Sequence, residues 1–253
     1  MILAAAIALG LLLGSFLSVL IARWPQWQGV SAGRSRCPHC RHELAWYDLV
    51  PLVSWLWVGG KCRYCRAPIA RFYVVLEVTM AGVLGLYAYL YGVPTGWYGV
   101  DYVILFGLVA LFFFDLRHQV LPDAIMAPLA VVVVGRLVSM RPDLLVNALV
   151  TGVVLSGLLG ALYALSRGRW LGFGDVKLAF VIGALFGFPA AVGVTLIAIW
   201  SGALVGMVLM ARHRATMQTA LPFGSFWTAS ALLALFAPGV VAFLSGLFIP
   251  AFL

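Results

Sequence analysis

The chain has 253 residues, of which 64% are hydrophobic and only 9% are charged. A soluble protein of this length needs far more charged residues to cover its surface, so the composition indicates a membrane protein. The net charge of +8 does not indicate a nucleic-acid partner, because basic residues in membrane proteins usually mark the cytoplasmic loops. Apolar stretches continue to the C-terminus, which excludes one cleaved signal peptide as their explanation.

Apolar stretches predict an all-α polytopic protein with about eight transmembrane helices, since a span needs about 20 mostly apolar residues. The first expected span is residues 1–22, and residues 23–71 are expected to form a small extramembrane domain. Residues 72–253 are expected to form a seven-helix membrane domain. Its spans are expected at 72–91, 101–114, 124–138, 144–165, two within 176–210 divided near Gly187, and one within 223–253.

Basic residues are distributed unevenly over the expected loops. If residues 23–71 lie inside, the loops on that side hold fourteen of the sixteen Lys and Arg residues, and only Arg136 and Arg141 lie outside. This asymmetry predicts a cytoplasmic location for the loop domain and an N-terminus outside. Membrane lipid is therefore an expected partner. The apolar patch at residues 49–58 is expected either to be the core of the loop domain or to lie on the bilayer surface.

Four cysteines form two C-x-x-C pairs, Cys37/Cys40 and Cys62/Cys65, separated by 21 residues. Two such pairs can supply four thiolates to one tetrahedral Zn²⁺, and the spacing is typical of a zinc ribbon. A cytosolic location disfavours disulfides, although disulfides and free thiols stay as alternatives. Four thiolates leave no open coordination position, so the expected zinc is structural. His39 and His42 are expected to be bystanders.

Two of the eight acidic residues are expected at the same depth, at the inner membrane edge. Asp115 follows the apolar run 111–114, and Asp175 ends the sequence Gly172-Phe173-Gly174-Asp175. Two adjacent carboxyl groups in a poorly hydrated place share one proton, as in an aspartic protease. The ionised group then activates a water molecule, and the protonated group stabilises the carbonyl oxygen.

A structural explanation competes for each of these residues. An Asp at a helix start is often only an N-cap, and Gly-x-Gly-Asp alone is more often a loop–helix junction than a catalytic motif. Asp123 is expected to be such an N-cap. The pairing of Asp115 with Asp175 favours catalysis, because acidic residues near the bilayer are costly and tend to be functional.

Two other classes of protein are weighed against this hypothesis. A presenilin-type intramembrane aspartyl protease also carries Gly-x-Gly-Asp, but the cysteines and the position of both acids at helix ends argue against it. A non-enzymatic transport or assembly component with a zinc-stabilised docking loop is the second alternative. Transporters tend to carry mid-membrane polar residues and internal repeats, and neither is evident here.

Several motifs in this order resemble the type IV prepilin peptidases over essentially the whole chain. The similar segments are 14–19, in which Ser18 replaces the usual Asn, 33–40, 51–55, 60–65, Glu77, Asp115 with 121–123, 172–177 and 222–224. The resemblance implies that Asp115 and Asp175 are catalytic. It also implies that Pro122, Asp123, Gly172, Gly174 and Lys177 support the catalytic loops.

The resemblance further implies the substrates and a second reaction. Members of this family remove a short basic leader from prepilins or type II secretion pseudopilins at the cytoplasmic face of the bacterial inner membrane. Many then methylate the new N-terminus with S-adenosylmethionine, an activity associated with the Cys-bearing part of the chain. Gly60, Lys61 and Glu77 are the residues expected to belong to the methyltransferase region. Glu77 alternatively reaches back to the polar interface near Arg71.

Overall fold

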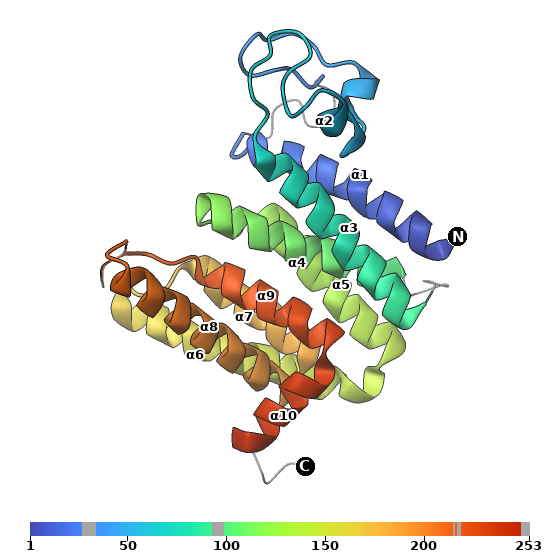
Figure 1. Cartoon of the computed structure of the whole chain (residues 1–253). Coiled ribbons are helices and arrows are strands. Elements are labelled where there is room, and N and C mark those ends of the chain that lie inside the picture. Colours follow the sequence, from blue (N-terminus) through green and yellow to red (C-terminus); the bar gives the residue numbers. More distant parts are fainter. Residues whose placement is uncertain (27–33, 93–98, 215, 217–218, 249–253) are drawn as a thin grey trace. The chain divides into compact units, whose positions relative to one another are not determined.

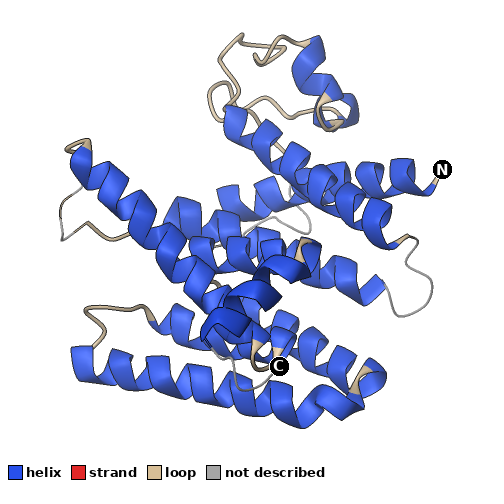
Figure 2. Cartoon of the chain, turned by 60° about the horizontal axis from the view of Figure 1, so that its bottom comes forward, coloured by secondary structure: helices blue, strands red, loops and turns tan. Residues whose placement is uncertain are grey.

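The structure, a computed structural model, describes residues 1–26, 34–92, 99–214, 216 and 219–248. Gly33 and the C-terminal end of the last expected span lie outside these residues. The chain divides into two units, residues 1–95 and 96–253. Figures 1 and 2 show helices joined by loops, and the described residues contain no β-strand apart from two isolated bridges. The all-α class is therefore confirmed.

The first unit consists of two long helices and the segment between them. α1 (Ile2–Ala22) packs along α3 (Arg71–Tyr91). Gly10 and Gly14 allow the close contact, because a Cβ on either glycine would lie 2.5 or 2.6 Å from a Cα atom of α3. Small residues four apart are a common means of packing membrane helices.

The segment between α1 and α3 contains η1 (Trp46–Leu49), α2 (Val53–Trp57) and the two cysteine pairs. None of residues 49–58 is buried, so the expectation that this apolar patch is the core of the loop domain is wrong. A five-residue helix cannot supply a core of its own, because it has too few side chains to bury.

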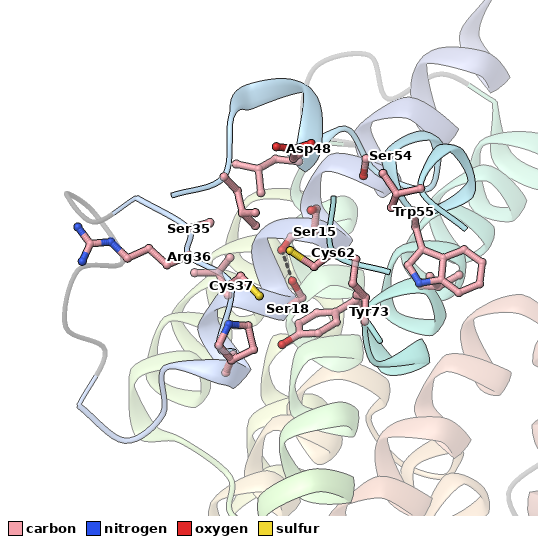
Figure 3. Close-up of a pocket in the computed structure, with 18 of the residues that line it drawn as sticks. Ser15, Ser18, Ser35, Arg36, Cys37, Asp48, Ser54, Trp55, Cys62 and Tyr73 are labelled. Carbon is pink, nitrogen blue, oxygen red and sulfur yellow. Dashed lines mark hydrogen bonds between the residues drawn. The ribbon is translucent and has the colours of Figure 1, made fainter. Parts of the chain in front are cut away.

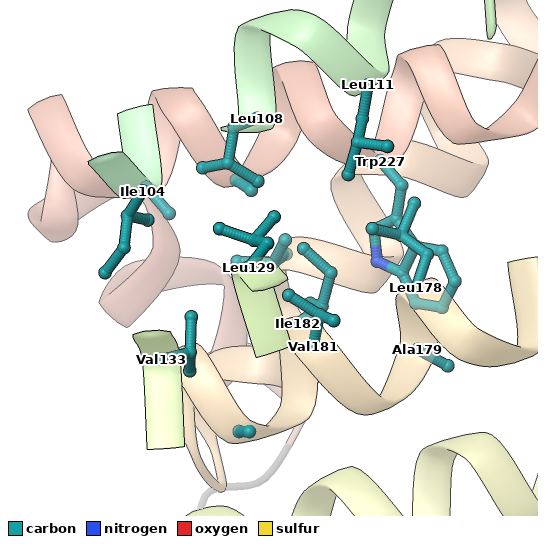
Figure 4. Packing of buried hydrophobic residues seen from close by; sticks show 14 of the residues in the cluster. Ile104, Leu108, Leu111, Leu129, Val133, Leu178, Ala179, Val181, Ile182 and Trp227 are labelled. Atoms are coloured by element: carbon teal, nitrogen blue, oxygen red, sulfur yellow. The ribbon is translucent and has the colours of Figure 1, made fainter. Parts of the chain in front are cut away.

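The second unit is a bundle in which α7 has contacts with α5, α6, α8 and α9. Its core joins side chains of α4, α5, α7 and α9, among them Leu108, Leu129, Ile182 and Trp227 (Figure 4). The elements of this unit are α4 (Gly99–His118), α5 (Asp123–Met140), η3 (Pro142–Leu144), α6 (Leu145–Ser166), α7 (Phe173–Phe186), α8 (Ala190–Ala211), α9 (Phe223–Phe236) and α10 (Pro238–Phe248).

Among the described residues, fewer helices have the length and composition of a membrane span than the roughly eight expected. By length and composition, six described helices can cross a membrane, or seven if α9 and α10 together form one span. α7 has only 14 residues, so it is about 21 Å long and shorter than the roughly 30 Å hydrocarbon layer. The last expected span is not one straight helix, because α9 and α10 meet at 107°. Pro238 begins α10 and cannot continue the hydrogen bonding of α9.

Candidate functional site

Asp115 lies in the last turn of α4, where its buried carboxyl group faces the beginning of α9. The backbone N–H and the hydroxyl group of Ser225 both donate to Oδ2 of Asp115, at 2.6 and 2.9 Å. Ser225 is the third residue of α9, so the positive end of that helix also acts on the carboxyl group. A Cβ on Gly224 would lie only 3.1 Å from the same oxygen, so the glycine permits this approach.

Asp175 lies in the first turn of α7 and is partly buried. Its Oδ2 accepts a hydrogen bond from the backbone N–H of Gly172 at 3.3 Å. The carboxyl group thus stabilises the helix start, as the structural explanation requires. This single long contact leaves the other carboxyl oxygen without a role in the cap.

Leu121 connects the surroundings of the two aspartates. A Cβ on Gly174, next to Asp175, would lie 3.1 Å from Cβ of Leu121, and a Cβ on Gly224 would lie 3.1 Å from its Cδ1. The negative charge of Asp115 also acts on the Asp175 carboxyl group. The structure therefore brings the two carboxyl groups to one end of the second unit, although they are 60 residues apart in the sequence.

Asp123 does not cap α5 as expected. Pro122 is the N-cap residue, and no side chain makes a capping hydrogen bond there. Asp123 is the first residue of the helix and instead forms an ion pair with Lys177, whose Nζ lies 2.6 Å from its Oδ1. The Lys177 ammonium group also lies over the ring of Phe173, 5.0 Å from its centre. This ion pair joins the start of α5, which follows Leu121 in the chain, to the start of α7.

The four cysteines form one cluster in which all sulfur atoms lie within 4.8 Å of one another. Cys37 Sγ and Cys65 Sγ are 3.8 Å apart, the separation of about 3.8 Å that two thiolates have in a tetrahedron with Zn–S bonds of about 2.3 Å. None of the four forms a disulfide. The cluster contains neither His39 nor His42, and the His42 ring stacks on Tyr64.

The two cysteine pairs have the same local structure. The N–H of Cys37 donates to the carbonyl of His42, and the N–H of Cys62 donates to that of Ala67. Each turn closes with an arginine at positive φ, Arg41 at 58° and Arg66 at 62°. These turns direct backbone N–H groups toward the sulfur atoms. The N–H of Cys40 in this way lowers the pKa of the Cys37 thiol from 9.0 to about 6, which favours its thiolate. Despite the hydrogen bond from the N–H of Ala67, burial and the three neighbouring sulfur atoms raise the pKa of the Cys65 thiol to about 11, so the four thiols are not equally ready to ionise without a metal ion.

A cavity of about 260 Å³ lies within the first unit, beside the cysteine cluster. Figure 3 shows Cys37 and Cys62 on one side of it and the ring of Trp55 on the other. Glu77 and Lys61 also line it. The indole N–H of Trp55 is buried and has no hydrogen-bond partner among the described residues. A Cβ on Gly60 would lie 2.8 Å from the Trp55 ring, so Gly60 leaves room for this wall of the cavity.

Glu77 is buried in α3 and does not extend back toward Arg71. Its Oε2 accepts the backbone N–H of Leu52 at 2.9 Å, and it also interacts with the hydroxyl group of Ser15. Leu52 has a φ of 58°, an uncommon conformation for a leucine, and the carboxyl group of Glu77 helps to hold it. The carboxyl group of Glu77 thus contacts Leu52 of the loop segment and Ser15 of α1, and its expected part in the methyltransferase region stays a prediction.

Two residues of these sites were not expected from the sequence. Ser225 follows the recognised segment 222–224 by one residue, and a serine in the first turn of a helix is too common to stand out. Trp55 belongs to the segment 51–55, and a tryptophan in such an apolar segment usually indicates an anchor at the membrane interface. Neither residue carries a charge, so the scarcity of charged residues that singled out the aspartates could not reveal them.

Comparisons with known proteins agree on one family. The sequence model of the Bacterial Peptidase A24 N-terminal domain matches residues 8–91, and that of the Type IV leader peptidase family matches residues 102–207. No solved structure matches the chain.

Three similar relatives are named Prepilin leader peptidase/N-methyltransferase. The protein of Stutzerimonas stutzeri is 31% identical, over 87% of this chain and 86% of the relative. That of Burkholderia pseudomallei strain 1026b is 32% identical, over 92% and 85%. That of Pseudomonas aeruginosa is 29% identical, over 90% and 88%. The chain is therefore a multi-pass membrane protein that belongs to the type IV leader peptidase family.

Proposed function

We propose that this chain removes the leader from prepilins or pseudopilins and then methylates the new N-terminus. The observation that supports the peptidase activity is that Asp115 and Asp175 both lie near Leu121 at one end of the second unit, where the charge of Asp115 acts on the Asp175 carboxyl group. Family membership favours leader removal over presenilin-type cleavage within a helix and over a non-enzymatic role.

The different partners of the two aspartates assign their roles. Asp115 accepts two hydrogen bonds on one oxygen and faces a helix N-terminus, and both features favour its ionised form. Asp175 has one long hydrogen bond and carries the shared proton. Asp115 then accepts a proton from water as the water oxygen attacks the amide carbon of the substrate. Asp175 donates its hydrogen bond to the carbonyl oxygen, and the proton on Asp115 passes to the leaving nitrogen.

Neighbouring residues hold this site together. Gly174 and Gly224 allow Leu121 and the start of α9 to approach the aspartates, and the Asp123–Lys177 ion pair joins α5 to α7. Pro122 and Gly172 are the N-cap residues of α5 and α7. The distribution of basic residues supports placement of this end at the cytoplasmic face of the inner membrane, where a basic leader is attracted by anionic lipid.

The cavity of the first unit supports the methyltransferase activity. When bound, S-adenosylmethionine supplies a methyl group on a sulfonium cation. Glu77 would hold that cation, and the free indole N–H of Trp55 would donate to a polar group of the ligand. The ammonium group of Lys61, which also lines the cavity, would pair with the carboxylate of S-adenosylmethionine. The volume of about 260 Å³ is just below the roughly 300 Å³ at which ligand pockets begin.

The four cysteines would hold Zn²⁺ as a structural ion. Their sulfur atoms lie within 4.8 Å of one another, with Cys37 and Cys65 3.8 Å apart, and Cys37 and Cys62 also line the cavity. A bound ion would therefore fix one wall of the methyl-donor site without taking part in the chemistry.

A mass measurement on a synthetic prepilin tests the proposed function. The purified chain in lipid nanodiscs should shorten the substrate by the mass of its leader. Adding S-adenosylmethionine should increase the product mass by one methyl group. An intact substrate would contradict the peptidase proposal, and a shortened but unmethylated product would contradict only the methyltransferase proposal.

A further inference from the structure

α2 lies alongside the long helices of the first unit and not beyond their ends. The hydrogen bond from Leu52 N–H to Glu77 holds the residue that precedes α2. Glu77 comes six residues after Arg71, the first residue of α3, so it lies about 9 Å along that helix at 1.5 Å per residue. α3 has the length and composition of a membrane span. Leu52 is therefore held at the second turn of a spanning helix.

The cavity places α2 at a similar depth along α1. Ser54, Trp55 and Val58 line the cavity together with Ser15 and Ser18 of α1 (Figure 3). Ser15 comes seven residues before Ala22, the end of α1, which is about 10 Å along the helix. The positions on α1 and α3 thus give α2 nearly the same depth. That depth is about a third of the hydrocarbon thickness of roughly 30 Å.

The opposite side of α2 is apolar and exposed. Val53, Leu56 and Trp57, here called the outer face of α2, are 59%, 69% and 81% exposed. Residues 49–60 carry no charged side chain. In water this face would expose three large apolar side chains on a helix too short to be stable by itself. At the edge of a bilayer the same face is favourable, and tryptophan prefers that region.

We propose that the outer face of α2 is a membrane-inserted segment that contacts lipid acyl chains at about a third of the depth of the hydrocarbon layer. The depth set by Glu77 and Ser15 identifies lipid as the partner, because the same stretches of α1 and α3 lie in the bilayer. The other side of α2 lines the cavity, so a molecule in the cavity would sit at the lipid–water boundary. This inference does not depend on either proposed reaction.

Photolabelling from lipid tests the proposal on the full chain in nanodiscs. A phospholipid carrying a diazirine about 10 Å below the hydrocarbon boundary should label residues 53–57 to a similar extent as Phe16 of α1. Phe16 is 45% exposed and lies six residues, about 9 Å, before the end of that helix. The cysteine turns at Arg41 and Arg66 should remain unlabelled. Labelling of Phe16 without labelling of residues 53–57 would overturn the proposal, whether water, the second unit or another copy of the chain covers the outer face.

A matched pair of variants separates lipid insertion from accidental labelling. Leu56→Asp should lower the labelling of Trp57 by about tenfold or more, because a carboxylate is strongly disfavoured among acyl chains. Leu56→Met should label like the wild type. Equal labelling of Trp57 in both variants would also overturn the proposal. Labelling of Phe16 in both variants confirms that the chain is correctly inserted.

Discussion

The two aspartates have the same side chain but different surroundings. Asp115 is buried and receives both hydrogen bonds of Ser225, whereas Asp175 is only partly buried and contacts the N–H of Gly172. Such a difference in hydrogen bonding gives two equal groups different protonation states. The asymmetry of the proposed mechanism thus depends on Ser225, which acts through Asp115 and is a positioning residue.

Replacing Ser225 tests this role. Ser225→Ala removes one of the two donors to Asp115, and a hydrogen bond to a charged group contributes about 1.5–3 kcal/mol. We expect kcat for leader removal to fall by about 10- to 100-fold with little change in KM, measured by timed cleavage of a synthetic prepilin. Ser225→Thr keeps the hydroxyl group and should retain most of the activity. An unchanged kcat in Ser225→Ala would contradict the positioning role.

The charged residues of the sites were accessible from the sequence, but their hydrogen-bond partners were not. Asp115 and Asp175 stand out because acids are scarce in an apolar chain, and the four cysteines stand out by their spacing. Ser225 meets Asp115 only because α9 packs on α4, a contact across 110 residues. Asp123 was expected to be a cap, but Lys177 lies close enough to pair with it. Such contacts depend on tertiary packing and have no local signal.

At the scale of the elements, the contact between α1 and α3 sets the position of the cavity. Gly10 and Gly14 bring the helix backbones together, and Glu77 stands at the second of these contacts. The same carboxyl group holds Leu52. A change in the separation of these helices would therefore move a wall of the cavity as well as weaken the packing.

Gly14→Ala tests the close contact. The new Cβ would lie 2.6 Å from the Cα of Glu77, so the helices must separate, and overpacking of this kind costs about 1–3 kcal/mol. We expect a lower unfolding temperature in nanodiscs together with weaker methyl transfer. Gly82→Ala is the matched control on α3, because its Cβ would meet nothing within 4 Å. Equal unfolding temperatures for the two variants would show that the contact is not tight.

The cysteine cluster makes a prediction about metal content. A Cys37→Ser, Cys62→Ser double variant removes the two buried ligands, one from each turn, and should lose the single zinc ion expected for each wild-type chain. Elemental analysis of the purified protein measures this directly. His39→Ala is the control and should keep the ion. Metal in the double variant at the wild-type ratio would rule out the four-thiolate site.

Element types were easier to predict than their lengths. Each expected span contains helix, because long apolar runs have few alternatives in a bilayer. The length of α7 and the 107° bend before α10 were not expected. Uninterrupted hydrophobicity does not show where a helix ends. Gly172 and Pro238 mark these boundaries, but both residue types also occur inside membrane helices, as Pro128 does in α5.

At the scale of the whole molecule, the two proposed reactions belong to different units. The aspartates lie in residues 96–253, and the cavity with the cysteine cluster lies in residues 1–95. The two matching family domains divide the chain in nearly the same way, at residues 8–91 and 102–207. Separate sites allow the reactions to be impaired independently. The finer division of the first unit into a helix and a loop domain stays a prediction.

Glu77→Gln tests this separation. The substitution keeps the side-chain size and removes the negative charge that would hold the sulfonium group, so methyl transfer should fall by about tenfold or more. Leader removal should continue at the wild-type rate. Asp143→Asn is the control, because this exposed acid pairs with nearby Arg141 and belongs to neither proposed site. A parallel loss of both reactions in Glu77→Gln would argue against separate sites.

The most direct test of the account is leader removal by Asp115→Asn and Asp175→Asn, each compared with the wild type on one synthetic prepilin. Both variants should still enter nanodiscs and bind the wild-type amount of zinc, because neither aspartate touches the first unit's metal cluster in the proposal. Both should leave the prepilin at its full mass, since one carboxyl group alone cannot both activate water and protonate the carbonyl oxygen. Wild-type processing by either variant would contradict the two-aspartate mechanism.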